Sequence, residues 1–553
     1  MKKHLFLMAA LGLGLAACTN DVLTPEDNAN ITSPDQENST STLKSAKLKS
    51  FDASPDRVKV EPQTRDAQPG SLTLIASITN PSTQEGIING FQKEGEEGRY
   101  LSATCVYFDS SDDKYYVTYH MQGNNYLTDQ IDETSGFIET FTLQEDGTPN
   151  PGKIYQTADP SKVDFDFNHL YFDVLNDDYL SYTGADAGQK RIVAAGHIAV
   201  PTSTGKYDTH AMISQLDLEN EEIAYTLVLT GEKLLNEEGK SLGDIDAGDV
   251  NCVLRKSNYY YLATRKGIAV LNAKDDNLFT PINNIETIEN ENGQKTSTVI
   301  ENSTYFVKTP GSAKHLSHIY TNSHFSLLYL TSPNPSTITA ETSSPANIIN
   351  FSMDQGSGTL CGSDTSDSNT EGPGILNSSD ITDLTLWSPN VNQYTIPETN
   401  ICPVDGKNVL SLADNNNLIT ACLGKNGLYV NNKDNHKEEV IKFSDKKDGT
   451  GSRPVNGVFV EGIEYYDGGR ATNGFIYVAN GACLTILDAA TLEKVEEFSA
   501  FDAKEDKNLA SANYVQVVKT NTYTNPASPD RIITVAFGQA GVKVFRFVPP
   551  TLK

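Results

Sequence analysis

The chain has 553 residues and a formal net charge of −29, with 72 Asp and Glu against 43 Lys and Arg. This length exceeds one ordinary domain unless the fold is a large repeat or barrel structure. A charge this negative repels nucleic-acid phosphates and anionic lipid headgroups, so we expect no nucleic acid partner and no direct attraction to a membrane surface.

Residues 1–18 have the pattern of a bacterial lipoprotein signal peptide. Two lysines precede the apolar run Leu5–Ala17, which is too short to span a bilayer as a stable helix. The run ends in the lipobox Leu15–Cys18, so we expect cleavage before Cys18 and attachment of lipid to its sulfur. An ordinary secretory signal with an incidental cysteine is the alternative.

The same segment predicts where the protein is located. Thr19 follows the cysteine, whereas an aspartate at that position is associated with inner-membrane retention in enteric lipoproteins. By this analogy we expect an outer membrane lipoprotein on the periplasmic or cell-surface face. It would contact the membrane through its lipid anchor only, since several buried acyl chains hold such an anchor stably.

Residues 19–66 are rich in Asn, Ser, Thr, Asp and Pro and show almost no apolar periodicity. Such a segment buries too little apolar surface to offset the entropy of ordering. We therefore expect a disordered tether between the lipid anchor and a folded part at residues 67–553.

The folded part consists of short β-forming runs separated by Gly, Asn, Asp and Pro turns, with no amphipathic helix of ordinary length. The clearest unit pairs the runs 475–480 and 483–488 across a tight glycine turn. Similar units occupy residues 259–272, 418–430 and 532–547. In the units at 418–430, 475–488 and 532–547, the first run ends at Ala421, Ala479 and Ala536, which are about 58 residues apart. This period predicts a repeat architecture.

Each unit is expected to contain four strands. One strand precedes the central pair, as at residues 457–461, and a more polar strand follows it, as at 494–498. Apolar central strands beside a charged outer strand are typical of propeller blades. The sequence thus predicts an all-β fold, a β-propeller with seven four-stranded blades. The units are expected to begin near Tyr100, Val163, Asp249, Tyr305, Asn408, Gly457 and Ala512.

The last unit supplies only three of its four strands. The alternating segment Leu72–Ile78 precedes the first unit and has the pattern of a strand. We predict that it becomes the outer strand of the last blade and closes the ring, because closure hides strand edges that would otherwise template aggregation.

The block at residues 475–488 is similar to the blade motif of LVIVD-type and related β-propellers in bacterial surface proteins. The lipobox with its Asn/Ser/Thr-rich sequel resembles lipoproteins of Bacteroidetes-like bacteria. The likeness covers the four units described above, and the first two hundred residues depart from the motif. It implies a propeller fold and a surface location, and little about chemistry.

The cysteines other than Cys18 do not form a zinc-binding pattern. Export would permit disulfides, but Cys105, Cys422 and Cys483 lie in apolar runs, where a free thiol behaves as a small hydrophobic group. Buried thiols are therefore the favoured interpretation.

Two groups of candidate metal ligands are also weak. His315 and His318 have odd spacing, which places them on opposite faces of a strand, and a turn separates His318 from His324. The carboxylates at Asp244, Asp246 and Asp249 lack the spacing of a calcium loop. We expect neither a metal nor a cofactor.

No catalytic residue can be assigned from the sequence. It contains no Gly-x-Ser-x-Gly motif and no phosphate-binding loop. The favoured hypothesis is a non-catalytic binding or scaffold protein for a polysaccharide or protein partner. The alternative is a glycan lyase or hydrolase with its site in the central funnel, where residues from several blades converge.

Overall fold

The computed structural model describes most of the predicted folded part and a segment before it. Nothing is described before residue 47. The described residues are 47–62, 68–81, 100–122, 136–158, 164–174, 190–201, 207–229, 247, 249–274, 278–289, 295–300, 304–308, 313–318, 324–330, 346–353, 356–361, 392–395, 412–415, 418–424, 427–432, 437–444, 453–461, 465–466, 469–470, 474–500, 510–520 and 529–551.

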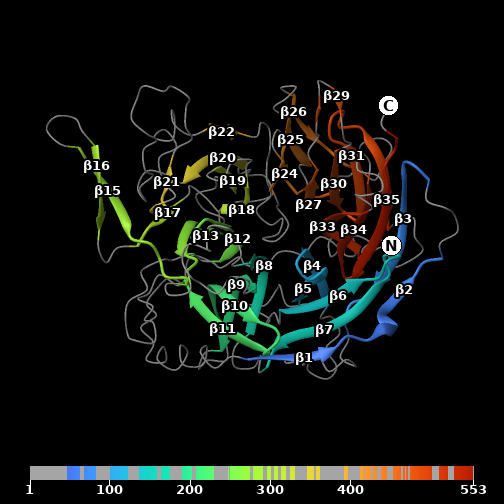
Figure 1. The fold of residues 1–553 in the computed structure, drawn as a ribbon, viewed down its shortest axis with the longest axis horizontal. Helices are drawn as coiled ribbons and strands as arrows, with labels where there is room; N and C mark the ends of the chain where they lie inside the picture. Colours follow the sequence, from blue (N-terminus) through green and yellow to red (C-terminus); the bar gives the residue numbers. More distant parts are fainter. Residues whose placement is uncertain are drawn as a thin grey trace, which may run out of the picture.

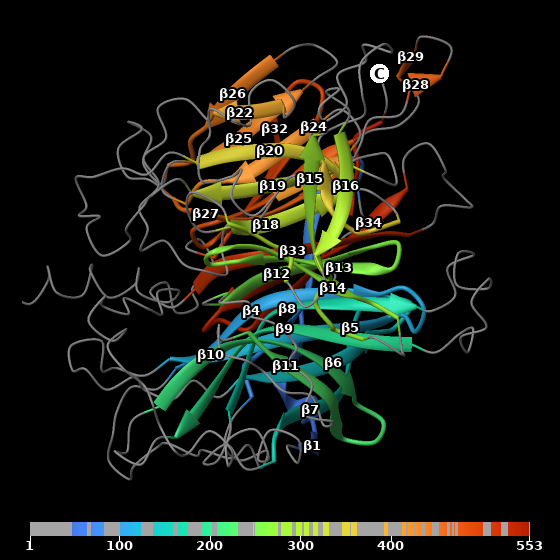
Figure 2. The ribbon, with the colours of Figure 1, turned by 90° about the vertical axis from the view of Figure 1, so that its left-hand side faces the viewer.

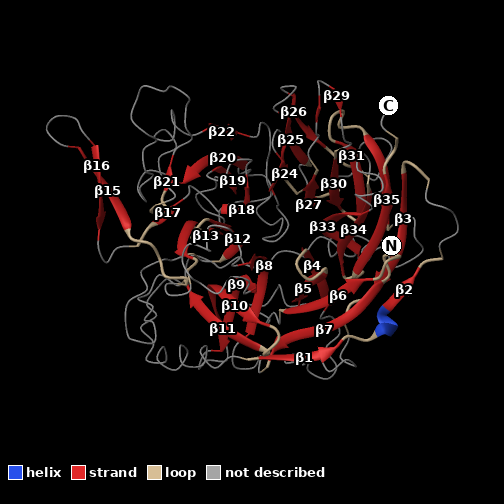
Figure 3. Ribbon diagram, viewed as in Figure 1, coloured by secondary structure: helices blue, strands red, loops and turns tan. Residues whose placement is uncertain are grey.

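The fold is all-β, and the described residues contain a single short 3₁₀ helix, η2 (Pro55–Arg57), as Figure 3 shows. Small antiparallel sheets succeed one another around a common centre in chain order, in a propeller-like arrangement (Figure 1). None of the described helical residues forms a segment long and apolar enough to cross a membrane.

Four sheets of the described part have four strands each. The first consists of β8 (Asp164–Val174), β9 (Lys190–Pro201), β10 (Tyr207–Asp217) and β11 (Glu222–Val228). The second consists of β12 (Val250–Lys256), β13 (Tyr259–Thr264), β14 (Gly267–Asn272) and β17 (Phe306–Lys308). The third consists of β23 (Leu412–Asn415), β24 (Leu418–Cys422), β25 (Leu428–Asn432) and β26 (Lys437–Ile441). The fourth consists of β27 (Val455–Val460), β30 (Phe475–Asn480), β31 (Cys483–Asp488) and β32 (Lys494–Ser499).

The other sheets differ in size. A five-stranded sheet contains β18 (Ala313–His318), β19 (His324–Leu330), β20 (Ala346–Met353), β21 (Leu360–Cys361) and β22 (Asn392–Thr395). A ten-stranded sheet contains β1 (Leu48–Asp52), β2 (Val58–Val60), β3 (Ser71–Ile78), β4 (Tyr100–Asp109), β5 (Lys114–Gln122), β6 (Phe137–Leu143), β7 (Pro149–Thr157), β33 (Ala510–Thr520), β34 (Asp530–Gly538) and β35 (Val542–Val548). Two hairpins stand apart: β15 (Asn284–Glu289) with β16 (Lys295–Ile300), and β28 (Tyr465–Tyr466) with β29 (Gly469–Arg470). The β15–β16 hairpin projects from the side of the ring (Figures 1 and 2).

The expected seven separate four-stranded blades are not found. Within the described residues the number of separate four-stranded sheets is four. The ten-stranded sheet arises because β34 and β4 are joined by one residue pair, Gly538 with Ala103, and because β1 and β2 add strands at its two ends. The expected start of a unit at Tyr305 is also wrong, since β17 is the fourth strand of the preceding sheet and the next sheet begins with β18.

The first strands of the sheets lie next to one another around the centre. In chain order these are β4, β8, β12, β18, β23, β27 and β33; each contacts the next, and β33 contacts β4. The central strands behind them are apolar on both faces, as predicted: every residue of β30 is buried. A sheet buried on both faces needs neighbours on both sides, which the ring supplies.

The predicted closing strand is confirmed. β3 pairs antiparallel with β35 over residues 71–78, so a segment from the beginning of the folded part completes the sheet formed by the end of the chain. The two strands lie side by side at the right of Figure 1. β3 is not the outermost strand, because β2 pairs with its free edge.

The predicted tether extends too far along the chain. Residues 47–62 fold onto the ring, with β1 pairing with β7 and β2 pairing with β3. Arg57 anchors this segment through a buried bidentate ion pair with Glu139, with atom separations of 2.6 and 2.8 Å. The segment is polar in composition, but its backbone pairs with the edges of the sheet and its one arginine pairs with a buried carboxylate. Residues 19–46 of the predicted tether lie outside the described residues, as does Cys18.

Candidate functional site at the centre of the ring

Six of the seven described first strands, all except β23, have a β-bulge or similar irregularity near their beginning. The extra residue re-aims the side chain that follows it. The pairing register shifts between Ala103 and Cys105, Phe167 and His169, Val250 and Cys252, Ala313 and His315, Val455 and Gly457, and Ala510 and Tyr514. The residues that follow the shift are therefore equivalent from sheet to sheet.

An asparagine at the bulge links each of several sheets to the next. Its side-chain nitrogen Nδ2 donates a hydrogen bond to a backbone carbonyl oxygen at the bulge of the neighbouring first strand. The pairs are Asn168 with Val250 (3.0 Å), Asn251 with Ala313 (2.7 Å), Asn456 with Ala512 (2.9 Å) and Asn513 with Ala103 (3.0 Å). These bonds hold neighbouring first strands in register, so they fix where the residues after the bulge lie.

Side chains from several first strands meet at the centre of the ring. The rings of Tyr107 and Tyr514 lie 5.4 Å apart, and the ring of Tyr107 contacts that of His169 edge-on at 5.4 Å. Burial raises the pKa of Tyr514 strongly, and the nearby thiols of Cys105 and Cys252 add to the effect. Tyr514 of β33, Tyr107 of β4 and His169 of β8 belong to consecutive first strands, and these strands line the centre of the ring.

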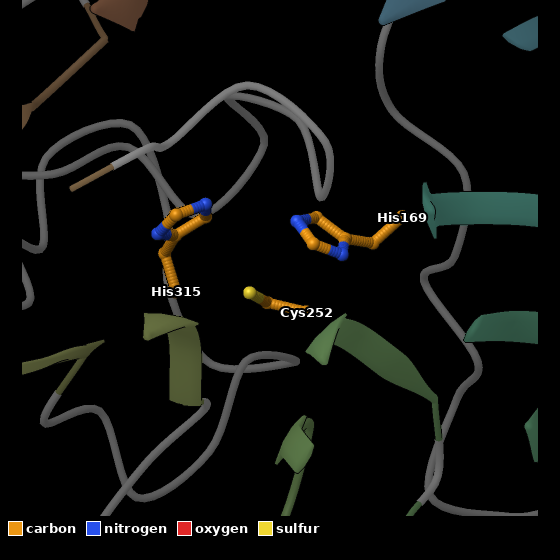
Figure 4. Close-up of side chains that lie close together, drawn as sticks. All are labelled: His169, Cys252 and His315. Atoms are coloured by element: carbon orange, nitrogen blue, oxygen red, sulfur yellow. The ribbon is translucent and has the colours of Figure 1, made fainter. Parts of the chain in front are cut away.

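Three potential metal ligands converge next to Tyr107. Figure 4 shows their side chains. His169 of β8, Cys252 of β12 and His315 of β18 each offer a ligand atom, and these atoms all lie within 4.8 Å of one another. The two imidazole rings are 5.9 Å apart, centroid to centroid, and nearly perpendicular. Cys252 is buried, whereas both histidines are half-buried.

The surroundings determine the protonation of the three groups. Burial, with a smaller contribution from His315, lowers the pKa of His169 to about 3, and burial lowers the pKa of His315 to about 4. Burial raises the pKa of the Cys252 thiol to about 12. At neutral pH the imidazoles are therefore uncharged, with a lone pair available, and the thiol carries its proton.

The sequence offers His315 as a candidate ligand together with His318 and His324. The side chains of His318 and His324 lie outside the described residues. The residues that do join His315 come from two other sheets, so spacing along one strand could not reveal them. A local signal is present at two of the three bulges: an apolar residue and an asparagine precede both His169 and Cys252, whereas Ala313 and Lys314 precede His315.

Of the three carboxylates at residues 244–249, the structure describes one. Asp244 and Asp246 lie outside the described residues, and Asp249 is buried. Asp249 accepts a hydrogen bond from Asn168 (3.0 Å) and lies 3.6 Å from Nδ1 of His197. Its carboxylate therefore belongs to the contact between the β8 and β12 sheets.

The prediction of buried thiols is confirmed for the cysteines that are described. Cys105, Cys252, Cys422 and Cys483 are all buried, and none of the four is in a disulfide. The side chains of Cys361 and Cys402 lie outside the described residues.

Comparison with known proteins identifies no family. No family model matches the chain, and no curated protein matches it. Among solved structures, similarity is found to the crystal structure of the computationally designed Ika8 protein. It covers 81% of this chain and 97% of that chain, with 10% identity and a TM-score of 0.31, which is too low to support an argument.

Proposed function

We propose that this protein is a lipid-anchored propeller outside the cytoplasm that acts as a non-catalytic binding or scaffold protein for a polysaccharide or protein partner. The lipobox ending at Cys18 and the acidic composition support the location. The ring of small sheets supports the role, because a rigid disc offers broad faces for a partner.

The blade number that we propose is seven. The ten-stranded sheet divides at its single β34–β4 residue pair into two groups, β4 to β7 and β33 to β35 with β3. With the five-stranded and the four-stranded sheets these make seven units, each with a first strand in the cycle that runs from β4 to β33. An experimental map that traces each sheet would test this count, and any other number of first strands at the centre would refute it.

The observation that carries the binding role is the packing at the centre of the ring. A glycan-cleaving enzyme of this kind needs an open funnel lined with acid and base groups. Near the centre, the buried ring of Tyr107 instead contacts the rings of Tyr514 and His169. This packing favours a partner bound on a face or rim of the ring over a substrate cleaved within it.

Lipid anchoring is tested by the variant Cys18→Ser. Replacing the sulfur removes the attachment point, so we expect the full chain to move from the membrane pellet to the soluble fraction and to lose incorporation of a labelled fatty acid. Cys483→Ser is the matched control, since this buried thiol lies in the folded part. Persistent fatty-acid labelling of Cys18→Ser would refute the anchor.

The binding role is tested by thermal unfolding with a panel of glycans and envelope protein fractions. A ligand at 100 times its dissociation constant adds ~2.7 kcal/mol to the free energy of unfolding. A reproducible rise in melting temperature without turnover of the ligand is expected for a binding protein. Cleavage of a glycan that also stabilises the protein would instead support the lyase or hydrolase alternative.

A further inference from the structure

The cluster of His169, Cys252 and His315 is the group of side chains whose chemistry the binding role does not use. We infer that these three residues form a binding site for a thiophilic transition metal ion of the zinc type, held by two imidazole nitrogens and one thiolate. This inference concerns a site at the centre of the ring and does not depend on the lipid anchor or on the identity of any partner.

The fold presents the three ligands from equivalent positions. Each follows the bulge of its strand, and β8, β12 and β18 are consecutive first strands. The hydrogen bonds from Asn168 to Val250 and from Asn251 to Ala313 join these three strands directly at their bulges. Such backbone-level support is what a metal site requires, because ligands on rigid elements keep their geometry.

The equivalent positions on the other first strands do not hold the same set of ligand residues. The equivalent residue is Cys105 in β4, Gly457 in β27 and Tyr514 in β33, so the bulge itself does not demand a ligand. Only the consecutive positions on β8, β12 and β18 combine two histidines with a cysteine among the described first strands. In addition, the buried Nδ1 of His315 has no hydrogen-bond partner among the described residues, which is costly for a buried polar atom unless a ligand occupies it.

The donor set determines the class of metal. Thiolate and imidazole ligands select zinc and copper, whereas calcium and magnesium require oxygen ligands. Zinc binds nitrogen at about 2.0–2.1 Å and sulfur at about 2.3 Å in a tetrahedral arrangement. The ligand atoms, now within 4.8 Å of one another, would need to approach by roughly 1 Å, which ring rotation can provide.

Binding is balanced by the release of one proton. The Cys252 thiol loses its proton to solvent as the sulfur–metal bond forms, while both imidazoles bind as neutral groups. Three protein ligands leave one tetrahedral position for water or another small ligand.

The first test uses the full chain after removal of metal with a chelator. Titration with Co²⁺ should produce a thiolate-to-cobalt charge-transfer band that saturates at about one ion per chain, because a cysteine ligand is present. Zn²⁺ should displace the Co²⁺, and Mg²⁺ and Ca²⁺ should not. Absence of the band, or its displacement by Mg²⁺, would overturn the proposal.

Variants assign the site. Cys252→Ser should abolish the charge-transfer band, and His315→Gln should weaken Zn²⁺ binding by about 100-fold or more, at least the effect of losing a supporting residue around a metal. Cys483→Ser and His197→Gln are the matched controls, because both residues are buried and lie outside the cluster. A band that survives in Cys252→Ser, or disappears equally in Cys483→Ser, would contradict the assignment.

A second measurement guards against misfolding. Zn²⁺ should raise the melting temperature of the wild-type chain and leave that of His315→Gln unchanged, while both chains show the same circular dichroism without metal. If Cys252→Ser does not fold, this comparison decides alone. An equal rise in both chains would overturn the proposal, since it would place the zinc elsewhere.

Discussion

Single side chains at the bulges join one sheet to the next. The asparagine that follows Phe167, Val250, Val455 or Ala512 donates to a carbonyl oxygen of the neighbouring first strand. Gly457 shows how close these strands approach, because a Cβ at this position would lie 2.6 Å from the carbonyl oxygen of Asn513. A larger residue would push the two strands apart.

The first prediction concerns this linkage. Asn456→Ala removes the hydrogen bond to the carbonyl oxygen of Ala512 and leaves that buried acceptor without its donor. We expect a loss of about 1–3 kcal/mol in the free energy of unfolding, measured by urea denaturation. Asn150→Ala, at an exposed strand position, is the control and should change stability by less than about 0.5 kcal/mol. Equal effects of the two variants would contradict a linking role.

The second prediction concerns acid sensitivity. Burial alone would raise the pKa of Glu497, but hydrogen bonds from Thr485 and Arg453 lower it below its ordinary value of 4.5. The unfolded chain therefore takes up this proton more readily, so the ionised group stabilises the fold above about pH 4.5 and this contribution is lost as the pH falls further.

Glu497→Gln should accordingly lower the melting temperature most at pH 7. The difference from the wild-type chain should shrink as the pH decreases below 4.5. Glu493→Gln, at an exposed loop position just before β32, is the matched control. A difference between Glu497→Gln and the wild-type chain that stays constant with pH would show that the carboxylate charge is not responsible.

At the scale of elements, the segment 47–62 is folded although its polar composition predicts disorder. It contains two short strands and the helix η2, and none of these would be stable without the sheet edges they contact. Arg57 lies at the end of η2 and reaches both oxygens of Glu139, which also accepts a hydrogen bond from Tyr119 (2.8 Å). The element is thus held by tertiary contacts.

The third prediction tests this attachment. Arg57→Met leaves Glu139 buried without its counter-charge, which typically costs ~3–5 kcal/mol. The double variant Arg57→Met with Glu139→Gln should recover part of this loss, because the buried charge is then absent. Lys59→Met, two residues further along at an exposed position, is the control for urea denaturation. No recovery in the double variant would show that the charge pair is not the cause.

At the scale of the whole molecule, closure depends on β3. This strand covers the edge of β35 and buries Ile75 and Ile78, which are 3% and 2% exposed. Without it the ring would have an open edge, and an unpaired edge is a template for association with other chains.

The fourth prediction is the effect of removing β3. Deletion of residues 70–79 should lower the free energy of unfolding by at least about 3–6 kcal/mol, the contribution of burying Ile75 and Ile78. It should also cause aggregation, because an edge is exposed. A variant that lacks residues 19–46 retains every described strand and should have the same melting temperature as the wild-type chain. Light scattering and calorimetry measure both properties, and a deletion of 70–79 that melts like the wild type would contradict closure by β3.

The sequence by itself determined the features that depend on local pattern. Apolar runs such as 475–480 and 483–488, separated by a glycine turn, predict paired buried strands because residues close in the chain pair with one another. The same reasoning identified β3 as the missing partner of β35, since one strand without a partner and one sheet without a fourth strand complement each other.

Only the tertiary structure decided what depends on contacts between distant residues. The polar segment 47–62 folds because sheet edges and Glu139 receive it, and one residue pair joins two groups of strands into a ten-stranded sheet. His169, Cys252 and His315 meet because the ring brings three separate strands to one centre. The spacing of the three residues along the sequence does not predict their proximity, because they come together only when the sheets close around the centre.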